Sequence, residues 1–230
     1  MSMRTRLGFS VCAIEQSLYQ SFGLGVFRLL GEDNLVYEHL LRHKVDEILL
    51  ISPDIRTNEF DKGYDFSRLI NRYIGIPACI GGSLTESALK ELLEWGCVER
   101  VMFSGSIQCK NQSKINIVTQ LYGRQAVVGC LALAVEENRV WILEENHRRY
   151  RHLSRSDIDR AFDLCDEVIF QDLGNYGKRN GFHYDEIVEL TPYPNRTIIN
   201  GGLLRTDLKR AMRDGLAAVY LDNLVMHSES

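Results

Sequence analysis

The chain repeats itself at an interval of 120 residues, and this repeat limits its fold more than any other feature. The segment VDEILLISPD resembles CDEVIFQDLG, and IPACIGGSLTESALKELLEWG resembles RTIINGGLLRTDLKRAMRDG. Within these segments Gly81-Gly82 recurs as Gly201-Gly202. After the helix that follows, the interval becomes 119, which one deletion explains. The chain is therefore expected to contain two copies of one structural unit.

Each copy contains four short apolar runs that alternate with segments of helical spacing. Strands that alternate with helices form a parallel sheet, and right-handed crossovers allow eight of them to close. A doubly wound open sheet is the alternative, but a repeat that closes on itself covers every strand edge. We predict an α/β fold, one (β/α)8 TIM barrel domain over 1–230, with half-barrels at about 1–120 and 121–230. The strands are expected at about 7–12, 47–52, 77–80, 100–104, 127–132, 168–172, 197–200 and 218–222.

The composition is ordinary for a globular protein, with 45% hydrophobic residues, 25% charged residues and a net charge of −4. Nothing in it resembles the basic footprint of a nucleic-acid-binding protein. The six cysteines are scattered without a CxxC pair, so we expect buried thiols, no metal and no cofactor. No apolar run is long enough to span a bilayer, and the start lacks a signal-peptide pattern. We expect a cytoplasmic protein that contacts no membrane.

Glycine-containing loops follow several predicted strands, at the end of a barrel where chemistry is found. Glycines let backbone N–H groups approach an anion closely, and a helix N-terminus adds favourable potential. We predict two phosphate-sized sites on opposite sides of the barrel mouth, although Asp222 would repel a phosphate at the second. Tight turns are the alternative explanation of the glycines. The candidate phosphate-binding residues are Gly81, Gly82, Ser104, Gly105, Gly177, Gly201, Gly202 and Asn223.

The motifs VDEILLISPD, IPACIGG, SGS, GKRNGFHYD and IINGG together resemble the cyclase subunit of imidazole glycerol phosphate synthase, through nearly the whole chain. The resemblance implies a barrel that binds a bis-phosphorylated ribonucleotide and receives ammonia from a glutaminase subunit. It also implies two catalytic aspartates, whose positions here are Cys12 and Ala132, and a loop lysine that falls at Gln20. Alanine cannot transfer a proton, and a thiol in an apolar strand tends to have a raised pKa. The family's cyclase chemistry is therefore not expected, and whether the chain is an enzyme stays open.

The resemblance also implies a ring of charged side chains that gates ammonia at the amino-terminal end of the barrel. The matching positions alternate in sign, as a salt-bridged ring would require. A structural plug of paired charges is the alternative, because a partly buried ion pair is weak evidence of function. The predicted ammonia gate consists of Arg6, Glu47, Arg100 and Glu167.

A divergent subgroup, associated with sugar amidation for surface polysaccharides, is similar to the segment LLRHKVDEILLISPDI. It implies a glutaminase partner and a separate sugar amidotransferase. The leading hypothesis is a barrel subunit of a glutamine amidotransferase system that accepts ammonia and binds a phosphorylated small molecule. The alternatives are the cyclase, a lyase of histidine biosynthesis, and a non-catalytic phosphate-binding scaffold. Because few residues follow the last predicted strand, we expect the last helix to be missing or truncated.

Overall fold

The computed structural model describes most of the chain, and the fold is stated for that part. The described residues are 4–14, 17–22, 26–30, 40–42, 44–52, 76–82, 84–94, 98–108, 112–144, 149–178 and 180–222. The segment after residue 222, where the last helix is expected to be missing or truncated, lies outside these ranges. No described helix is both long and apolar enough to cross a membrane.

Eight parallel strands close into a barrel. Their order is β10-β11-β12-β1-β4-β5-β6-β7, and β7 pairs back with β10. Each overlaps a strand expected from the sequence, so the predicted (β/α)8 barrel is confirmed. The strands are β1 (Arg6–Ile14), β4 (Glu47–Ser52), β5 (Ala78–Gly82), β6 (Arg100–Phe103), β7 (Val127–Glu136), β10 (Glu167–Asp172), β11 (Thr197–Asn200) and β12 (Ala218–Leu221).

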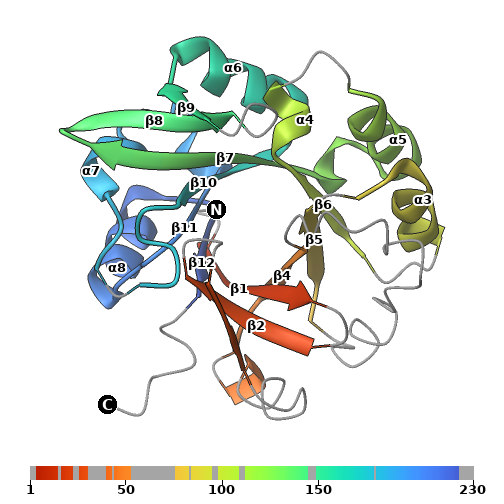
Figure 1. Ribbon diagram of the computed structural model, residues 1–230, viewed down its shortest axis with the longest axis horizontal. Helices are drawn as coiled ribbons and strands as arrows, with labels where there is room; N and C mark the ends of the chain where they lie inside the picture. The colour runs from red at the N-terminus through yellow and green to blue at the C-terminus, as the bar shows by residue number, and fades with distance from the viewer. Residues whose placement is uncertain are drawn as a thin grey trace.

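Helices lie around the outside of the barrel, as Figure 1 shows. Leu89 and Leu93 of α3, Ile115 and Val118 of α5, and Phe162 of α6 are buried in a core between helices and strands. The helices are α3 (Glu86–Glu94), α4 (Gly105–Gln108), α5 (Ser113–Tyr122), α6 (Arg155–Leu164), α7 (Tyr184–Val188) and α8 (Arg205–Asp214), with 3-10 turns η2 (Arg124–Ala126) and η3 (Pro194–Arg196).

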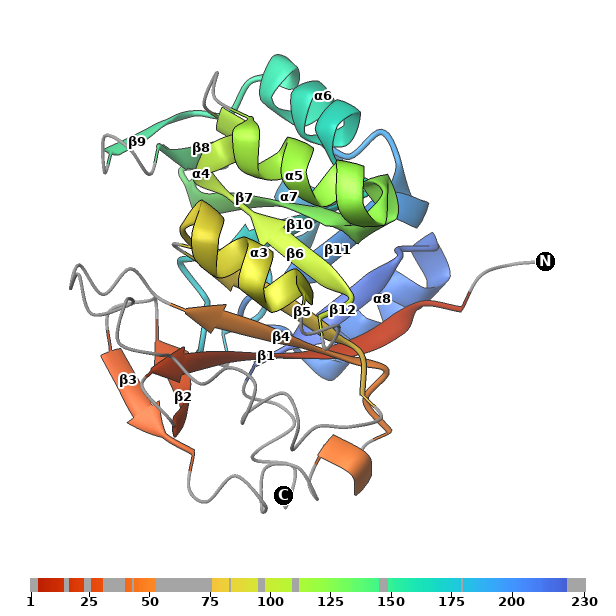
Figure 2. The same cartoon turned by 90° about the vertical axis from the view of Figure 1, so that its right-hand side faces the viewer.

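Two antiparallel hairpins extend the barrel at the carboxyl-terminal ends of its strands. The strands β2 (Ser17–Phe22) and β3 (Val26–Leu29) continue from β1, whereas β8 (Arg139–Glu144) and β9 (Arg149–His152) continue from β7. Figure 2 shows both hairpins at the same end of the molecule, to the left. They occur at corresponding places in the two repeats, although the sequence gives them little similarity.

Strand pairing relates the two repeats independently of the sequence. Cys12 of β1 lies opposite Ile51 of β4, and Ala132 of β7 lies opposite Gln171 of β10. Cys12 and Ala132 therefore occupy equivalent places, 120 residues apart, as the sequence repeat indicates.

The interval shortens earlier than the sequence repeat indicates. Equivalent pairs join Leu49 to Cys79 and Ile169 to Ile198, so β5 and β11 are related by 119 residues rather than 120. Gly82 therefore corresponds to Gly201, and the two have similar positive φ angles of 128° and 114°. The expected one-to-one match of the two Gly-Gly pairs is wrong by one residue.

A second shift separates the next strands. Cys79 pairs with Arg100 in the first repeat, and Ile198 pairs with Ala218 in the second, an interval of 118. The residue that corresponds to Ser104 after β6 is accordingly Asp222 after β12.

The barrel interior forms a core of its own, separate from the core beneath the helices. It includes Cys12, Leu49, Cys79, Met102, Cys130, Tyr176 and Tyr220. The four described free cysteines are buried, in agreement with the expected buried thiols. Tyr176 and Tyr220 are among the largest fully buried side chains, so two aromatic rings lie in this interior core.

Candidate functional site

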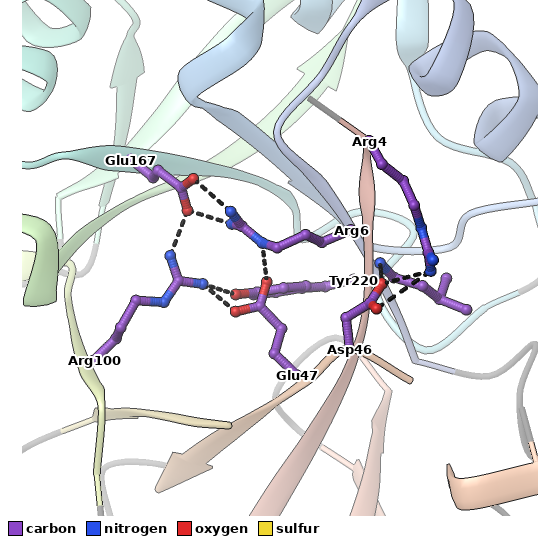
Figure 3. Close-up of polar contacts among 8 residues, drawn as sticks. Arg4, Arg6, Asp46, Glu47, Arg100, Glu167 and Tyr220 are labelled. Atoms are coloured by element: carbon purple, nitrogen blue, oxygen red, sulfur yellow. Dashed lines mark hydrogen bonds and ion pairs between the residues drawn. The ribbon is translucent and has the colours of Figure 1, made fainter. Parts of the chain in front are cut away.

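A closed ring of alternating charges lies at the amino-terminal end of the barrel. Arg6, Glu47, Arg100 and Glu167 are the first residues of β1, β4, β6 and β10, so the barrel brings their side chains together. We call these four residues the charged ring. Each glutamate contacts both arginines, and Figure 3 shows the circuit.

The contacts within the charged ring have the geometry of strong hydrogen bonds. Arg6 donates from Nε to Glu47 Oε1 at 3.1 Å and from Nη1 to Glu167 Oε1 at 2.9 Å. Arg100 donates to both glutamates as well. The Arg6 side chain is 36% exposed and the Glu47 side chain only 6%, so Arg6 is the member nearest to solvent.

Charge compensation within the ring shifts the pKa values of Glu167 and Arg6 toward their charged forms. Burial raises the pKa of Glu167, but hydrogen bonds and charges from Arg6 and Arg100 outweigh it and lower the pKa below its ordinary value. Burial lowers the pKa of Arg6, and the two glutamates more than reverse that effect. Glu167 and Arg6 are therefore charged at neutral pH.

Tyr220 lies next to the charged ring, on the lumen side. Its hydroxyl accepts a 2.8 Å hydrogen bond from Arg100 Nη2, and the side chain is fully buried. Gly8 makes room for it, because a Cβ there would lie 2.0 Å from the Tyr220 ring. Sequence reasoning missed both residues, and the only available signal was a glycine and a tyrosine on strands that pair with each other.

The two positions implied as catalytic lie inside the barrel without a carboxylate. Cys12 is fully buried, and burial raises the pKa of its thiol to about 12 despite a hydrogen bond with Ser21 that lowers it. Ala132 is buried on the equivalent strand. Gln20 of β2 is buried, and its Nε2 has no hydrogen-bond partner among the described residues. A thiol with such a pKa stays protonated at neutral pH and is a poor general base.

The second predicted phosphate site contains a carboxylate. Backbone N–H groups of Gly177 and Gly202 both donate to Asp222 Oδ2, at 2.7 and 3.2 Å. Gly201 lies close to the end of β10, where a Cβ would be 2.4 Å from the Asp172 carbonyl oxygen. Gly177, Gly201 and Gly202 thus lie around the ends of β10 and β11. Asn223 lies outside the described residues.

A second buried carboxylate holds the loop after β10. Asp172 is fully buried and accepts from Asn175 Nδ2 at 2.9 Å and from the backbone N–H of Asn175. His183 Nδ1 lies 2.7 Å from Asp172 Oδ2. This cluster was not predicted, because its members are spread through a loop that the sequence presents only as rich in glycine and basic residues.

Among the described residues, the first predicted phosphate site has a serine hydroxyl where the second has a carboxylate. Gly81 and Gly82 end β5, and Ser104 and Gly105 follow β6, so the paired strands bring the two loops together. Ser104 Oγ is buried and has no hydrogen-bond partner among the described residues. Gly81 faces Met102, whose side chain lies where a Cβ would be. The arrangement offers a hydroxyl donor, beside glycine backbone, to a ligand at this side of the mouth.

A groove of about 750 Å³ lies elsewhere, beside the β8–β9 hairpin. None of the site residues predicted from the sequence lines it. Within the part of the chain that the structure describes, no group of three or more His, Cys, Asp or Glu side chains could hold a metal ion. The groove is lined by Asn138, Arg139, Val140, His152, Leu153, Ser154, Arg155, Ile158, Asp185, Glu186, Glu189 and Leu190.

Comparison with known proteins identifies two distant relatives. The imidazole glycerol phosphate synthase subunit HisF of Flavobacterium psychrophilum is 25% identical over 170 residues, which cover 68% of this chain and 63% of that protein. The subunit HisF of Flavobacterium johnsoniae is 22% identical over 175 residues, which cover 70% of this chain and 64% of that protein. No family model matches the chain.

The matched region thus spans less than two thirds of the length of either relative. Together with the closed parallel barrel, these two similarities support a HisF-like TIM barrel.

Proposed function

We propose that this HisF-like barrel is the ammonia-accepting subunit of a glutamine amidotransferase system and that it binds a phosphorylated small molecule. The observation that carries the proposal is the closed charged ring at the amino-terminal end of the barrel. Ammonia delivered by a glutaminase would enter there, because the ring lies at the amino-terminal end of the barrel. The glycine loops lie at the other end. The half-barrels at about 1–120 and 121–230 would form this lumen jointly.

The ring has the properties expected of a gate. Its most exposed member, Arg6, can swing outward while Arg100 continues to neutralise both glutamates, so opening leaves no carboxylate unpaired. A gate built this way opens at a smaller electrostatic cost than one whose opening leaves a buried charge without a partner.

Exposed apolar side chains near the same face support a docked glutaminase. Leu121 and Tyr122 end α5 and lead into β7, and Tyr193 precedes η3 and leads into β11. All three are exposed. Exposed aromatic and apolar side chains are enriched in protein interfaces. The relatives' name, a synthase subunit, describes a component of an assembly.

The product of the system is proposed to be an amidated sugar rather than an imidazole ring. The buried pair Cys12 and Ala132 supplies neither an acid nor a base of suitable pKa for the cyclase reaction. Ammonia would instead pass to a separate sugar amidotransferase, in the biosynthesis of a surface polysaccharide. Histidine-pathway cyclase activity is the alternative.

The test is glutamate release by a candidate glutaminase subunit, with and without the barrel. We expect stoichiometric barrel to raise the rate on complex formation, and Leu121→Asp to abolish the increase. Leu29→Asp, at an exposed site on the opposite end, is the matched control and should leave it intact. An unchanged glutamate release rate with excess barrel would contradict the proposal and favour a non-catalytic scaffold. Turnover of the aminoimidazole ribonucleotide with ammonium salts would favour the cyclase instead.

A further inference from the structure

Two loops at the carboxyl-terminal mouth direct backbone N–H groups at one point, and an internal carboxylate occupies that point. Gly177 comes from the loop after β10, and Gly202 from the loop after β11. Both donate to the same oxygen, Asp222 Oδ2, at 2.7 and 3.2 Å. Asp222 is only 4% exposed, so the contact is shielded from solvent. We call the two converging N–H groups the 177/202 cradle.

The 177/202 cradle has the chemistry of an anion site. Converging backbone N–H groups of glycine loops form concavities that bind phosphate oxygens, and a carboxylate can take the same place. The distance from Gly177 N lies in the range of charge-assisted hydrogen bonds. The loop geometry is fixed, because Gly202 has a φ of 70° and a Cβ there would lie 2.6 Å from the Asn175 carbonyl oxygen.

A phosphate cannot share the cradle with Asp222. Both would need the same two donors, and two anions in contact in a buried place repel strongly. The fully buried Asp172 carboxylate, at the neighbouring end of β10, adds further negative potential nearby. The cradle is therefore satisfied from within the chain.

The other side of the mouth differs at the corresponding position. Strand pairing makes Ser104 the counterpart of Asp222, and its buried hydroxyl has no partner among the described residues. A serine can donate to an anion, whereas an ionised aspartate can only accept. At this equivalent position one side of the mouth carries a hydroxyl and the other a carboxylate.

We propose that Asp222 is an internal anion that closes the 177/202 cradle, so that this barrel takes a ligand carrying one phosphate group rather than two. The ligand with one phosphate group rests on the proposed function, whereas the closure of the cradle by Asp222 does not. Asp222 is accordingly a specificity-determining residue that excludes bis-phosphorylated molecules.

The test is an NMR titration of the ¹⁵N-labelled full chain with inorganic phosphate. In the unaltered protein the amide signals of Gly177 and Gly202 should not respond. In Asp222→Ser, which copies the residue of the other repeat, both signals should shift and saturate. The affinity of the cradle should be tighter by at least roughly tenfold than in the unaltered protein. Asp222→Asn is the matched control, because its amide oxygen still accepts from both N–H groups, and it should not gain the site.

Thermal unfolding covers the case in which Asp222→Ser is poorly folded, since it leaves two N–H groups without their acceptor. Phosphate or formate should then raise its midpoint markedly, with little effect on the unaltered protein or on Asp222→Asn. Saturable shifts of the Gly177 and Gly202 signals in the unaltered protein would overturn the proposal. The proposal would also be overturned if folded Asp222→Ser showed neither a signal shift nor a higher unfolding midpoint with phosphate or formate.

The same titration separates this proposal from the proposed function. A response of the Gly82 and Gly105 amide signals in the unaltered protein supports a ligand with one phosphate, bound at the side of the mouth that carries Ser104. If these two signals do not shift, the phosphorylated ligand is removed from the proposed function. The titration of Asp222→Ser still tests whether Asp222 closes the 177/202 cradle.

Discussion

Arg100 donates a 2.8 Å hydrogen bond to the hydroxyl of Tyr220, so one arginine belongs both to the charged ring and to the packing of the lumen. The Nη2 that makes this bond also donates to Glu47, and Nη1 donates to Glu167. Any movement that opens the ring at Arg100 would also release the hydroxyl of a fully buried tyrosine, which would be left without this partner. Opening at Arg6 avoids that penalty.

Removing one charge of the ring should be strongly destabilising. In Glu167→Gln the two arginines keep only Glu47 as an anionic partner, and we expect a loss of about 3 kcal/mol or more in the free energy of unfolding. Arg4→Gln is the matched control, since the Arg4–Asp46 pair is largely exposed and should cost at most about 1 kcal/mol. Urea unfolding of the two variants measures the difference. Equal losses would show that the ring is electrostatically unimportant.

The ring should also make stability depend on pH in the acid range. The pKa of Glu167 is lower in the folded chain than its ordinary value of 4.5. Its contribution to stability is therefore fully present above that value and is lost as the pH falls through the lower, folded-state pKa. Unfolding free energies from pH 7 downward should decline less steeply for Glu167→Gln than for the unaltered chain. Parallel curves for the two proteins would refute this assignment.

The buried thiols should be inert in the folded chain. Burial raises the pKa of Cys12 and Cys165 to about 12, and that of Cys79 to about the same value, so almost no thiolate exists at pH 8. Iodoacetamide should leave these three residues unmodified in the native protein and alkylate them in urea, as mapped by mass spectrometry. Rapid alkylation of Cys12 under native conditions would reopen a catalytic role for it.

The sequence predicted the barrel well because each strand is a short apolar run and the repeat fixes their number. It did not reveal the hairpins. The β7–β8 turn places Glu137 and Asn138 at positive φ angles of 51° and 59°. An Asn-Gly or Asp-Gly pair would have predicted this turn from the sequence, but Glu-Asn does not.

The candidate site was predicted only in part, for a related reason. Similarity aligns Gly81-Gly82 with Gly201-Gly202, but a sequence match does not report which side of a strand a residue faces. Only strand pairing shows that Gly82 corresponds to Gly201. The positions of the charged ring were easier to predict from the sequence. Glu47 and Glu167 are 120 residues apart and hold equivalent places in the strand pairing.

Gly8 should be essential because of Tyr220. A Cβ at position 8 would lie 2.0 Å from Cδ1 and 2.3 Å from Cε1 of the tyrosine, and the ring is enclosed by other lumen residues. Overpacking of this kind costs about 1–3 kcal/mol or more, so Gly8→Ala should lower the free energy of unfolding by at least that amount.

A second substitution identifies the cause of that loss. Tyr220→Leu should cost stability on its own, through a cavity and the lost Arg100 bond, but it removes the atoms that an alanine at position 8 would strike. In a double-mutant cycle the combined variant should therefore be more stable than the sum of the single losses implies, by about 1 kcal/mol or more. Additive losses would mean that the Gly8 backbone, rather than its contact with Tyr220, sets the requirement for glycine. Coupling would establish that the Tyr220 ring beside the charged ring is the reason why position 8 requires glycine.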